Sequence, residues 1–180
     1  MEKPSFVVTG ASATGKTTLI ESAMAIGYEH LPTYTTREIR PGEIDGIYSK
    51  FVTEEEITER FNEGEFIEDS LDYMRVNSTG IYYGTPRLWT EQLRYPEKCA
   101  TPVAPKIARK VVELSGVVWV HLVCSDEDRI RRLEMRGVNN DELQARMYSG
   151  ESIETPQEAV KYDTSEATTQ EILNDIIHRR

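Results

Sequence analysis

The sequence predicts a three-layer α/β fold in which helices cover both faces of a parallel central sheet. Two apolar runs, residues 5–9 and 117–123, are typical of buried parallel strands, because such strands have no solvent-facing side. Helical spacing of apolar residues follows the first run, over residues 17–25. Strands that alternate with helices favour the α/β class, and 180 residues suffice for one domain with a small insertion.

The stretch that joins the first strand to the first helix has the pattern of a phosphate-binding loop. Residues 10–17, Gly-Ala-Ser-Ala-Thr-Gly-Lys-Thr, match G-x-x-x-x-G-K-[ST] between a strand and a helix. The two glycines let the backbone wrap a polyphosphate with N–H groups inward, and the helix N-terminus adds attraction for anions. Lys16 would meet the β and γ phosphates of ATP, and the Thr17 hydroxyl would bind Mg²⁺.

The predicted ATP-binding residues of this loop extend one position into the helix. They are Gly10, Ala11, Ser12, Ala13, Thr14, Gly15, Lys16, Thr17 and Thr18. The alternative is a strand-to-helix turn with no ligand, which requires the pattern and both flanks to coincide by chance.

Charge and composition limit the possible partners. The formal net charge of -10 disfavours nonspecific binding to nucleic acid or to an anionic membrane, so an anionic substrate requires a local cluster of basic residues. No run approaches 18 apolar residues and residues 1–4 show no signal-peptide pattern, so we expect a soluble, cytoplasmic protein. Cys99 and Cys124 lie in no C-x-x-C pattern, and we expect both to be reduced and buried, without a metal or redox role.

A second candidate anion site lies in residues 35–48. Arg37 and Arg40 stand three apart, and a guanidinium fork matches the geometry of a phosphate. The alternative is a solvated charged loop, in which Glu38, Glu43 and Asp45 pair with the two arginines. Both interpretations stay open on this pattern alone.

The middle of the chain predicts a small second sheet. Residues 53–56 form a capping box that starts a helix through Phe61, which Gly64 should end. Residues 65–76 and 80–85 read as strands joined by turn-forming residues. Thr85 and Pro86 would then begin a helix over residues 87–93, and the chain would return to the main sheet at Cys99.

The second half continues the alternation. His121 lies inside an apolar strand, which favours a satisfied buried histidine over a catalyst. A capping box at residues 125–128 would open a helix to about Arg136, and residues 141–147 continue the helical pattern. Residues 159–163 predict a weak last strand, and a capping box at residues 168–171 predicts a final amphipathic helix. The chain shows no internal repeat and no linker.

Four blocks of the first 150 residues resemble the guanylate kinase family. The family combines a phosphate loop with T-T-R-x-x-R-x-G-E-x-x-G about twenty residues later, as residues 35–46 do here. Residues 66–68, Phe-Ile-Glu, and 82–85, Tyr-Tyr-Gly-Thr, match its next signatures. Arg132-Leu133-Glu134-Met135-Arg136-Gly137, followed by Arg146, looks like its lid.

The resemblance implies a P-loop kinase fold with a small mixed β acceptor-binding insertion and a helical lid. In one domain over 1–180 it places the core at about 1–32, 86–125 and 155–180, the insertion at about 33–85, and the lid at about 126–154. The implied activity is transfer of the γ-phosphate of MgATP to GMP or dGMP, with small-molecule nucleotides and no nucleic acid or membrane as partners. Such chemistry needs positioning and charge neutralisation, and no general base, because the acceptor phosphate is already anionic.

The same resemblance assigns site residues. The catalytic group comprises Lys16, Arg132, Arg136 and Arg146, which sets these lid arginines apart from the neighbouring Arg129 and Arg131 as ordinary surface charge. Glu68 would accept hydrogen bonds from guanine N–H groups, and Thr33 would bond O6. The acceptor-binding residues are Thr33, Arg37, Arg40, Glu43, Tyr48, Glu68, Tyr83 and Thr85, and Thr17 is the metal ligand.

Two departures from the family pattern keep alternatives open. The family has G-x-D-Y-x-F where residues 46–51 read Gly-Ile-Tyr-Ser-Lys-Phe, so Tyr48 comes one residue early and would face the other side of a strand. The family has D-I-D-x-Q-G where residues 99–104 read Cys-Ala-Thr-Pro-Val-Ala, which removes two carboxylates near guanine and magnesium. This supports a kinase of the same fold with broader (deoxy)nucleotide specificity. A noncatalytic protein-binding module is a further alternative, although such modules lose the phosphate loop.

Overall fold

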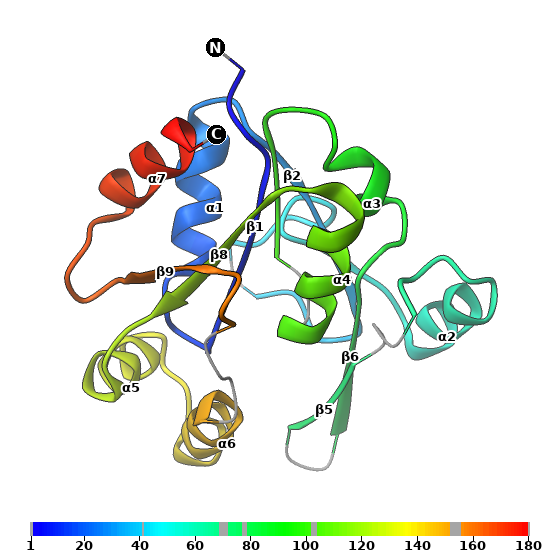
Figure 1. Cartoon of the computed structure of the whole chain (residues 1–180). Coiled ribbons are helices and arrows are strands. Elements are labelled where there is room, and N and C mark those ends of the chain that lie inside the picture. The colour runs from blue at the N-terminus through cyan, green and yellow to red at the C-terminus, as the bar shows by residue number, and fades with distance from the viewer. Residues whose placement is uncertain are drawn as a thin grey trace.

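The computed structural model describes residues 2–40, 42–68, 72–76, 79–101, 104–151 and 156–179. Its larger sheet has five strands in the order β2-β7-β1-β8-β9, and every neighbouring pair is parallel (Figure 1). The strands are β1 (Phe6–Gly10), β2 (Glu29–Leu31), β7 (Lys98–Ala100), β8 (Val118–Val123) and β9 (Val160–Asp163). The predicted parallel central sheet is confirmed.

Helices pack on both faces of this sheet because the strand side chains alternate in direction. On one face, Phe6 and Val8 of β1 pack against α1 (Lys16–Ala25) and α7 (Thr169–His178). On the other face, Val7 packs with residues of α3 (Trp89–Gln92) and α4 (Pro105–Ser115). These two apolar clusters on opposite faces give the three layers that the sequence predicts.

The second sheet is mixed and has the order β4-β3-β6-β5. The strand β3 (Thr33–Thr35) pairs in parallel with β4 (Ser49–Phe51) and antiparallel with β6 (Thr79–Gly84), which pairs antiparallel with β5 (Asp72–Val76). Beneath it lies α2 (Glu54–Asn62), which begins at the predicted Thr53 capping box. A small core of Tyr34, Ile57 and Phe66 joins this helix to the sheet, and the rings of Tyr34 and Phe66 lie edge to face with 5.4 Å between their centroids.

Two further helices lie beyond the carboxyl end of β8, across from the β5–β6 hairpin (Figure 1). They are α5 (Asp126–Met135) and α6 (Asn140–Glu151), and they contact each other. The Ser125 hydroxyl caps α5 by accepting from Asp128 N, but the reciprocal half of the predicted box is absent because Ser125 N donates to Ser165 Oγ. Within the described ranges, no helix is long and apolar enough to cross a membrane.

Two predicted elements are shorter than their sequence patterns indicated. The helix predicted over residues 87–93 begins only at Trp89, because Thr85 and Pro86 are held in extended pairings: Ile67 N donates to Thr85 O at 3.0 Å, and Phe66 bridges Pro86. The strand predicted over residues 65–76 is present as β5 alone. Residues 69–71 and 77–78 lie outside the described part of the chain.

Burial was predicted for one histidine and two cysteines, and the structure agrees for His121 and Cys99. His121 is 2% exposed, and its Nδ1 lies 2.9 Å from Thr9 Oγ1, which confirms a satisfied buried histidine. Burial lowers the pKa of His121 and raises the pKa of Cys99 to about 12. Cys124 is half-buried, so the expectation of burial is wrong for this cysteine, which lies directly after the carboxyl end of β8.

Candidate active site

The loop between β1 and α1 has the backbone conformation that its glycines predict. Gly10 has φ 147°, and a Cβ there would lie 2.4 Å from Leu122 O and 2.7 Å from Thr14 Oγ1, so only glycine fits. Gly15, at the start of α1, has φ 96°. Ala13 also has a positive φ, 67°, although it carries a side chain, and it is buried.

Side chains bind the carbonyl oxygens of five consecutive loop residues, 10–14. Lys16 Nζ donates to Gly10 O and Ala11 O, each at 2.7 Å. The next three carbonyls accept from Arg129 Nε at 3.2 Å, Arg132 at 3.1 Å and Thr164 Oγ1 at 3.1 Å. Because the C=O and N–H of a trans peptide point in opposite directions, this arrangement turns the loop N–H groups away from these side chains. Such a row of N–H groups suits an anion.

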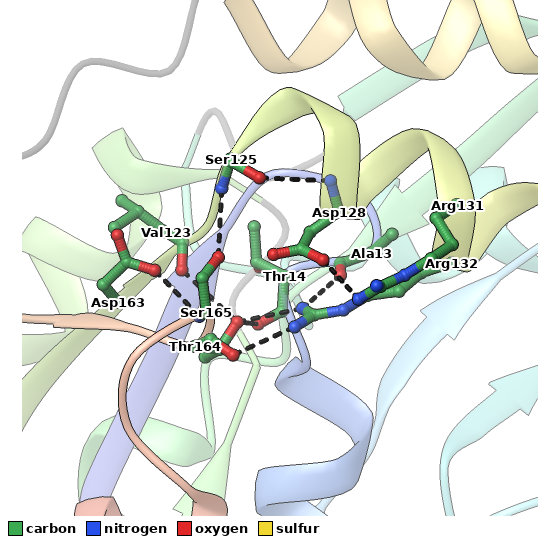
Figure 2. A network of polar contacts seen from close by, with 10 residues as sticks. All are labelled: Ala13, Thr14, Val123, Ser125, Asp128, Arg131, Arg132, Asp163, Thr164 and Ser165. Atoms are coloured by element: carbon green, nitrogen blue, oxygen red, sulfur yellow. Dashed lines mark hydrogen bonds and ion pairs between the residues drawn. The ribbon is translucent and has the colours of Figure 1, made fainter.

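Arg132 anchors the loop to the segment after β9, as Figure 2 shows. One terminal nitrogen donates to Ala13 O and to Thr164 Oγ1 at 2.9 Å, and the other donates to Thr164 O at 3.0 Å. Thr164 in turn donates its backbone N–H to Val123 O at 2.8 Å. Both terminal nitrogens of Arg132 therefore bind protein oxygens, whereas the sequence suggested a group directed at transferring phosphates.

Arg129, which the sequence analysis set aside as ordinary surface charge, is 4% exposed. Besides Ser12 O, it binds Asp126 Oδ1 at 2.9 Å and the backbone oxygen of Arg146 at 3.1 Å. The prediction is wrong because only the tertiary arrangement brings α5 over the loop. Arg131, two residues on, has an exposed side chain paired with Asp128, as expected of surface charge.

The other two lid arginines differ from each other. Arg146 donates to Ser12 Oγ at 3.2 Å and to Glu142 Oε1 at 2.9 and 2.5 Å. Arg136, which ends α5, is exposed, and within the described ranges its side chain makes no hydrogen bond or ion pair. Of the predicted lid arginines, Arg136 is therefore the one whose guanidinium remains open to a ligand.

A cluster of cations surrounds the loop. Burial and then the charges of Arg136, Arg129 and Arg146 lower the pKa of Lys16 to about 8. Burial, Arg37 and Arg146 lower the pKa of Arg40 in the predicted acceptor segment. Arg146 thus lies close enough to affect both Lys16 on the donor loop and Arg40 on the acceptor segment. In a chain of net charge -10, this local concentration of positive charge favours a polyanion.

In the acceptor segment, Arg37 and Glu43 form a two-pronged ion pair with both distances at 2.6 Å. The Glu43 carboxylate also accepts from Arg40 N at 2.9 Å. Burial would raise the pKa of Glu43, but the hydrogen bonds from Arg37 and Arg40 outweigh it and lower the pKa. Arg37 also lies over the Phe51 ring at 5.0 Å. Pairing of Arg37 with an acidic neighbour, the alternative interpretation, is therefore observed.

The remaining predicted acceptor residues lie on and around the second sheet. Thr33 and Thr85 are buried, and Tyr83 pairs with Thr35 across β3 and β6. Tyr48 lies in the turn before β4 and its hydroxyl donates to Glu21 Oε1 of α1 at 3.2 Å, so the strand-face argument does not apply to it.

Glu68 follows Ile67, whose backbone N–H donates to Thr85 O at 3.0 Å. Glu68 lines a cleft of about 1120 Å³ together with His30, Lys50 and Lys110, and Lys110 Nζ donates to Glu68 O at 3.0 Å. Pro32 and Tyr34, which flank Thr33 in the sequence, line the same cleft.

A metal site must use few protein ligands. In the part of the chain that the structure describes, no three His, Cys, Asp or Glu side chains gather where they could hold an ion. Thr17 is exposed in the first turn of α1, directly after Lys16, and its hydroxyl makes no hydrogen bond to the described residues. A single hydroxyl fits Mg²⁺, which takes one or two protein ligands when phosphates and water complete its shell.

Comparisons with known proteins show which family the chain resembles. The family model for guanylate kinase matches residues 2–163. Guanylate kinase from Symbiobacterium thermophilum is 32% identical over 162 residues, which cover 87% of this chain and 74% of that protein. Guanylate kinase from Aliivibrio fischeri is 33% identical over 170 residues, which cover 88% and 75%.

The fold is similar to that of a solved guanylate kinase structure. The crystal structure of guanylate kinase from Anaplasma phagocytophilum matches with a TM-score of 0.60 at 19% identity, over 98% of this chain and 84% of that one. At this identity the match shows a shared fold, whereas the family model and the relatives above carry the assignment. The chain therefore belongs to the guanylate kinase family of ATP-dependent nucleoside monophosphate kinases.

Proposed function

We propose that this protein transfers the γ-phosphate of MgATP to the 5′ phosphate of GMP or dGMP. The observation that carries the proposal is the position of Arg146, whose guanidinium donates to Ser12 Oγ of the donor loop at 3.2 Å and whose charge, after burial and Arg37, lowers the pKa of Arg40 on the acceptor segment. A phosphoryl group passing between two nucleotides bridges such regions, and positive charge there stabilises its transition state.

The donor side holds the ATP phosphates in this proposal. The N–H groups of residues 11–13 and 15 face away from the side chains that bind the loop carbonyls, and so can point to phosphate oxygens, whereas Thr14 N donates to Ala11 O at 3.5 Å. An ammonium has three N–H donors, so Lys16 keeps one beyond its bonds to Gly10 O and Ala11 O. Thr17 would hold the Mg²⁺ that bridges and neutralises the phosphates.

The acceptor side binds a monophosphate. Arg40 has a guanidinium that makes no hydrogen bond to described residues, and Arg37 keeps two of its five N–H groups beyond those bound to Glu43 and Glu38. Arg136 would stabilise the negative charge of the phosphoryl group during transfer. The insertion at about 33–85 and the lid at about 126–154 would then close over the core, and exclude water from the phosphates.

Guanine recognition is the finer part of the proposal. Thr33 in β3 would bond O6, and Glu68, whose cleft is also lined by the Thr33 neighbours Pro32 and Tyr34, would accept from the guanine N–H groups. A charge-assisted hydrogen bond contributes about 1.5 to 3 kcal/mol, so Glu68 alone supports a preference for guanine of tenfold or more.

A kinase with a broader range of acceptors is the second candidate, and one observation favours it. Cys99 and Thr101 stand where the family has the two aspartates of D-I-D-x-Q-G, while Pro102 and Val103 lie outside the described residues. One fewer carboxylate lowers the margin by which guanine is preferred.

A coupled assay of ATP consumption with GMP, dGMP, AMP, CMP, UMP and TMP tests the proposal. We expect the highest kcat/KM with GMP or dGMP. Glu68→Gln should reduce the preference for GMP over AMP by at least about tenfold, with Glu65→Gln as a control on the same segment. Equal turnover of AMP or a pyrimidine nucleotide in the parent enzyme would replace the guanine assignment with the broader one.

A further inference from the structure

Arg129 binds the Ser12 carbonyl of the phosphate loop, but its other two contacts have no role in the function described so far. It lies on α5, where its side chain is 5% exposed, whereas the side chain of Arg131 on the same helix is 68% exposed. Burying a guanidinium is unfavourable unless its N–H groups find acceptors, so its partners show what holds it there.

Those partners come from three different parts of the molecule. Each nitrogen of the guanidinium donates once: Nε to Ser12 O at 3.2 Å, one terminal nitrogen to Asp126 Oδ1 at 2.9 Å, and the other to Arg146 O at 3.1 Å. Ser12 belongs to the phosphate loop and Arg146 to α6. Asp126, the only anion of the three, has a side chain that is 62% exposed, so charge pairing alone does not account for the burial.

Ser12 closes a triangle between these groups. Its carbonyl accepts from Arg129, and its hydroxyl accepts from Arg146 at 3.2 Å. Arg129 binds the backbone of Arg146, and therefore fixes the point on α6 from which the Arg146 side chain extends toward the loop. The planar guanidinium suits this task, because its N–H groups diverge at fixed angles.

We propose that Arg129 is a positioning residue that holds α6 against the phosphate loop and so places the Arg146 guanidinium for phosphoryl transfer. The inference rests on the proposed function, in which Arg146 lies between the donor and acceptor phosphates. Arg129 itself touches no reacting atom in this role, and acts through Arg146.

Enzyme kinetics on five variants test the proposal: three single substitutions in α5, then Arg146→Met and the double variant. Arg129→Met keeps the length of the side chain and removes its donors, Arg129→Lys keeps the charge without the fork, and Arg131→Met is the matched control on the exposed side of α5. We expect Arg129→Met to lower kcat at least about tenfold while both KM values change less than about threefold, with little rescue in Arg129→Lys. Arg131→Met should stay within about twofold of the parent.

The last two variants, Arg146→Met and the double variant, separate positioning through Arg146 from a general effect on folding. In an Arg146→Met background, Arg129→Met should lower kcat by less than about twofold, because the group it positions is already gone. An equal loss in both backgrounds, or a parent-like kcat in Arg129→Met, would overturn the proposal.

Amide hydrogen exchange supplies a measurement that does not depend on the acceptor. In Arg129→Met, exchange in residues 143–148 of α6 should accelerate at least about tenfold while exchange in α7 is unchanged. If Arg129→Met does not fold, Arg129→Lys is measured in its place. Unchanged exchange in α6 would overturn the inference, whereas failure of the parent to phosphorylate GMP would count only against the proposed function.

Discussion

The phosphate loop and the acceptor segment are the two proposed anion sites, yet their backbones are held in place very differently. In the loop, side chains from α1, from α5 and from the segment after β9 bind the carbonyls of residues 10–14. The acceptor segment is held largely by its own side chains: Glu43 binds Arg37 and Arg40 N, and Asp45 accepts from Phe51 N. Ile39 and Ile44 of this segment are 49% and 58% exposed.

This difference suggests that the two sites have different roles in catalysis. A loop fixed from several elements is preorganised for the transition state, which is where electrostatic stabilisation has its largest effect. A segment held largely by its own side chains can adjust to its ligand at small cost, which suits acceptor binding and closure. Changes on the donor side should therefore reduce kcat, and changes on the acceptor side should raise the acceptor KM.

The largest expected effect comes from Lys16→Met. The variant removes the charge that would meet the transferring phosphate, so we expect kcat to fall about hundredfold or more with the fold retained. Steady-state kinetics with ATP and GMP, with circular dichroism as a check on folding, measure this. Lys161→Met, which changes an exposed lysine of β9, is the matched control and should have parent-like kinetics. A kcat within about threefold of the parent in Lys16→Met would contradict the assignment.

The next largest effect should be on acceptor binding by Arg40. Arg40→Met removes a guanidinium that makes no hydrogen bond to described residues, so we expect the GMP KM to rise at least about tenfold while the ATP KM changes less than about threefold. Arg109→Met, which changes an exposed arginine of α4 paired with Glu158, serves as the control. An unchanged GMP KM would return Arg40 to the solvated-loop interpretation.

Glu43→Gln should give a smaller effect on the same constant. It leaves the Arg40 side chain in place but weakens the two-pronged bond to Arg37, whose side chain is 12% exposed. A looser segment must be ordered on binding, so the GMP KM should rise about threefold to tenfold with kcat nearly constant. If kcat falls more than KM rises, the segment contributes to the transition state and the division between the two regions is too simple.

Local sequence patterns predicted the elements that depend on local chemistry. The phosphate loop, the Thr53 and Thr168 capping boxes and the apolar strand β8 were all predicted from contiguous residues. The N-cap at Thr85 was wrong because antiparallel pairing of Thr85 and Pro86 with residues 66–67 overrides a local preference.

Contacts distant in sequence could not be predicted in this way. The bond from Arg129 to Ser12 spans 117 residues, and the bond from Thr164 to Thr14 spans 150. No spacing rule links such positions, and a buried arginine on α5 has the same local pattern as its exposed neighbour Arg131. The one available signal was the excess of arginines in α5, which indicates that some of them serve more than solubility.

Thr164→Val tests whether the anchoring of the donor loop matters for its rigidity. Valine keeps the shape but loses the hydroxyl that accepts from Arg132 at 2.9 Å and donates to Thr14 O at 3.1 Å. Losing these partners should cost about 1 to 3 kcal/mol of unfolding free energy, or a few degrees in Tm, and raise the ATP KM a few-fold. Thr164→Ser, which retains the hydroxyl, should stay close to the parent. Equal effects of both substitutions would point to the methyl group instead.

The smallest expected effect is a pH dependence of ATP affinity set by Lys16. Burial and three neighbouring arginines lower the pKa of Lys16 to about 8, so the free protein loses this charge as pH rises through that value. Phosphates favour the protonated amine, whereas the γ-phosphate is already fully ionised above pH 7 because its second pKa is about 6. ATP affinity should therefore fall about fourfold between pH 7.0 and 8.5, as the charged fraction falls from about 0.9 to 0.24. Calorimetry in buffers of different ionisation enthalpy should show proton uptake on ATP binding near pH 8. Lys16→Met should abolish both this uptake and the pH dependence of ATP affinity. If either persists in that variant, the titrating group lies elsewhere.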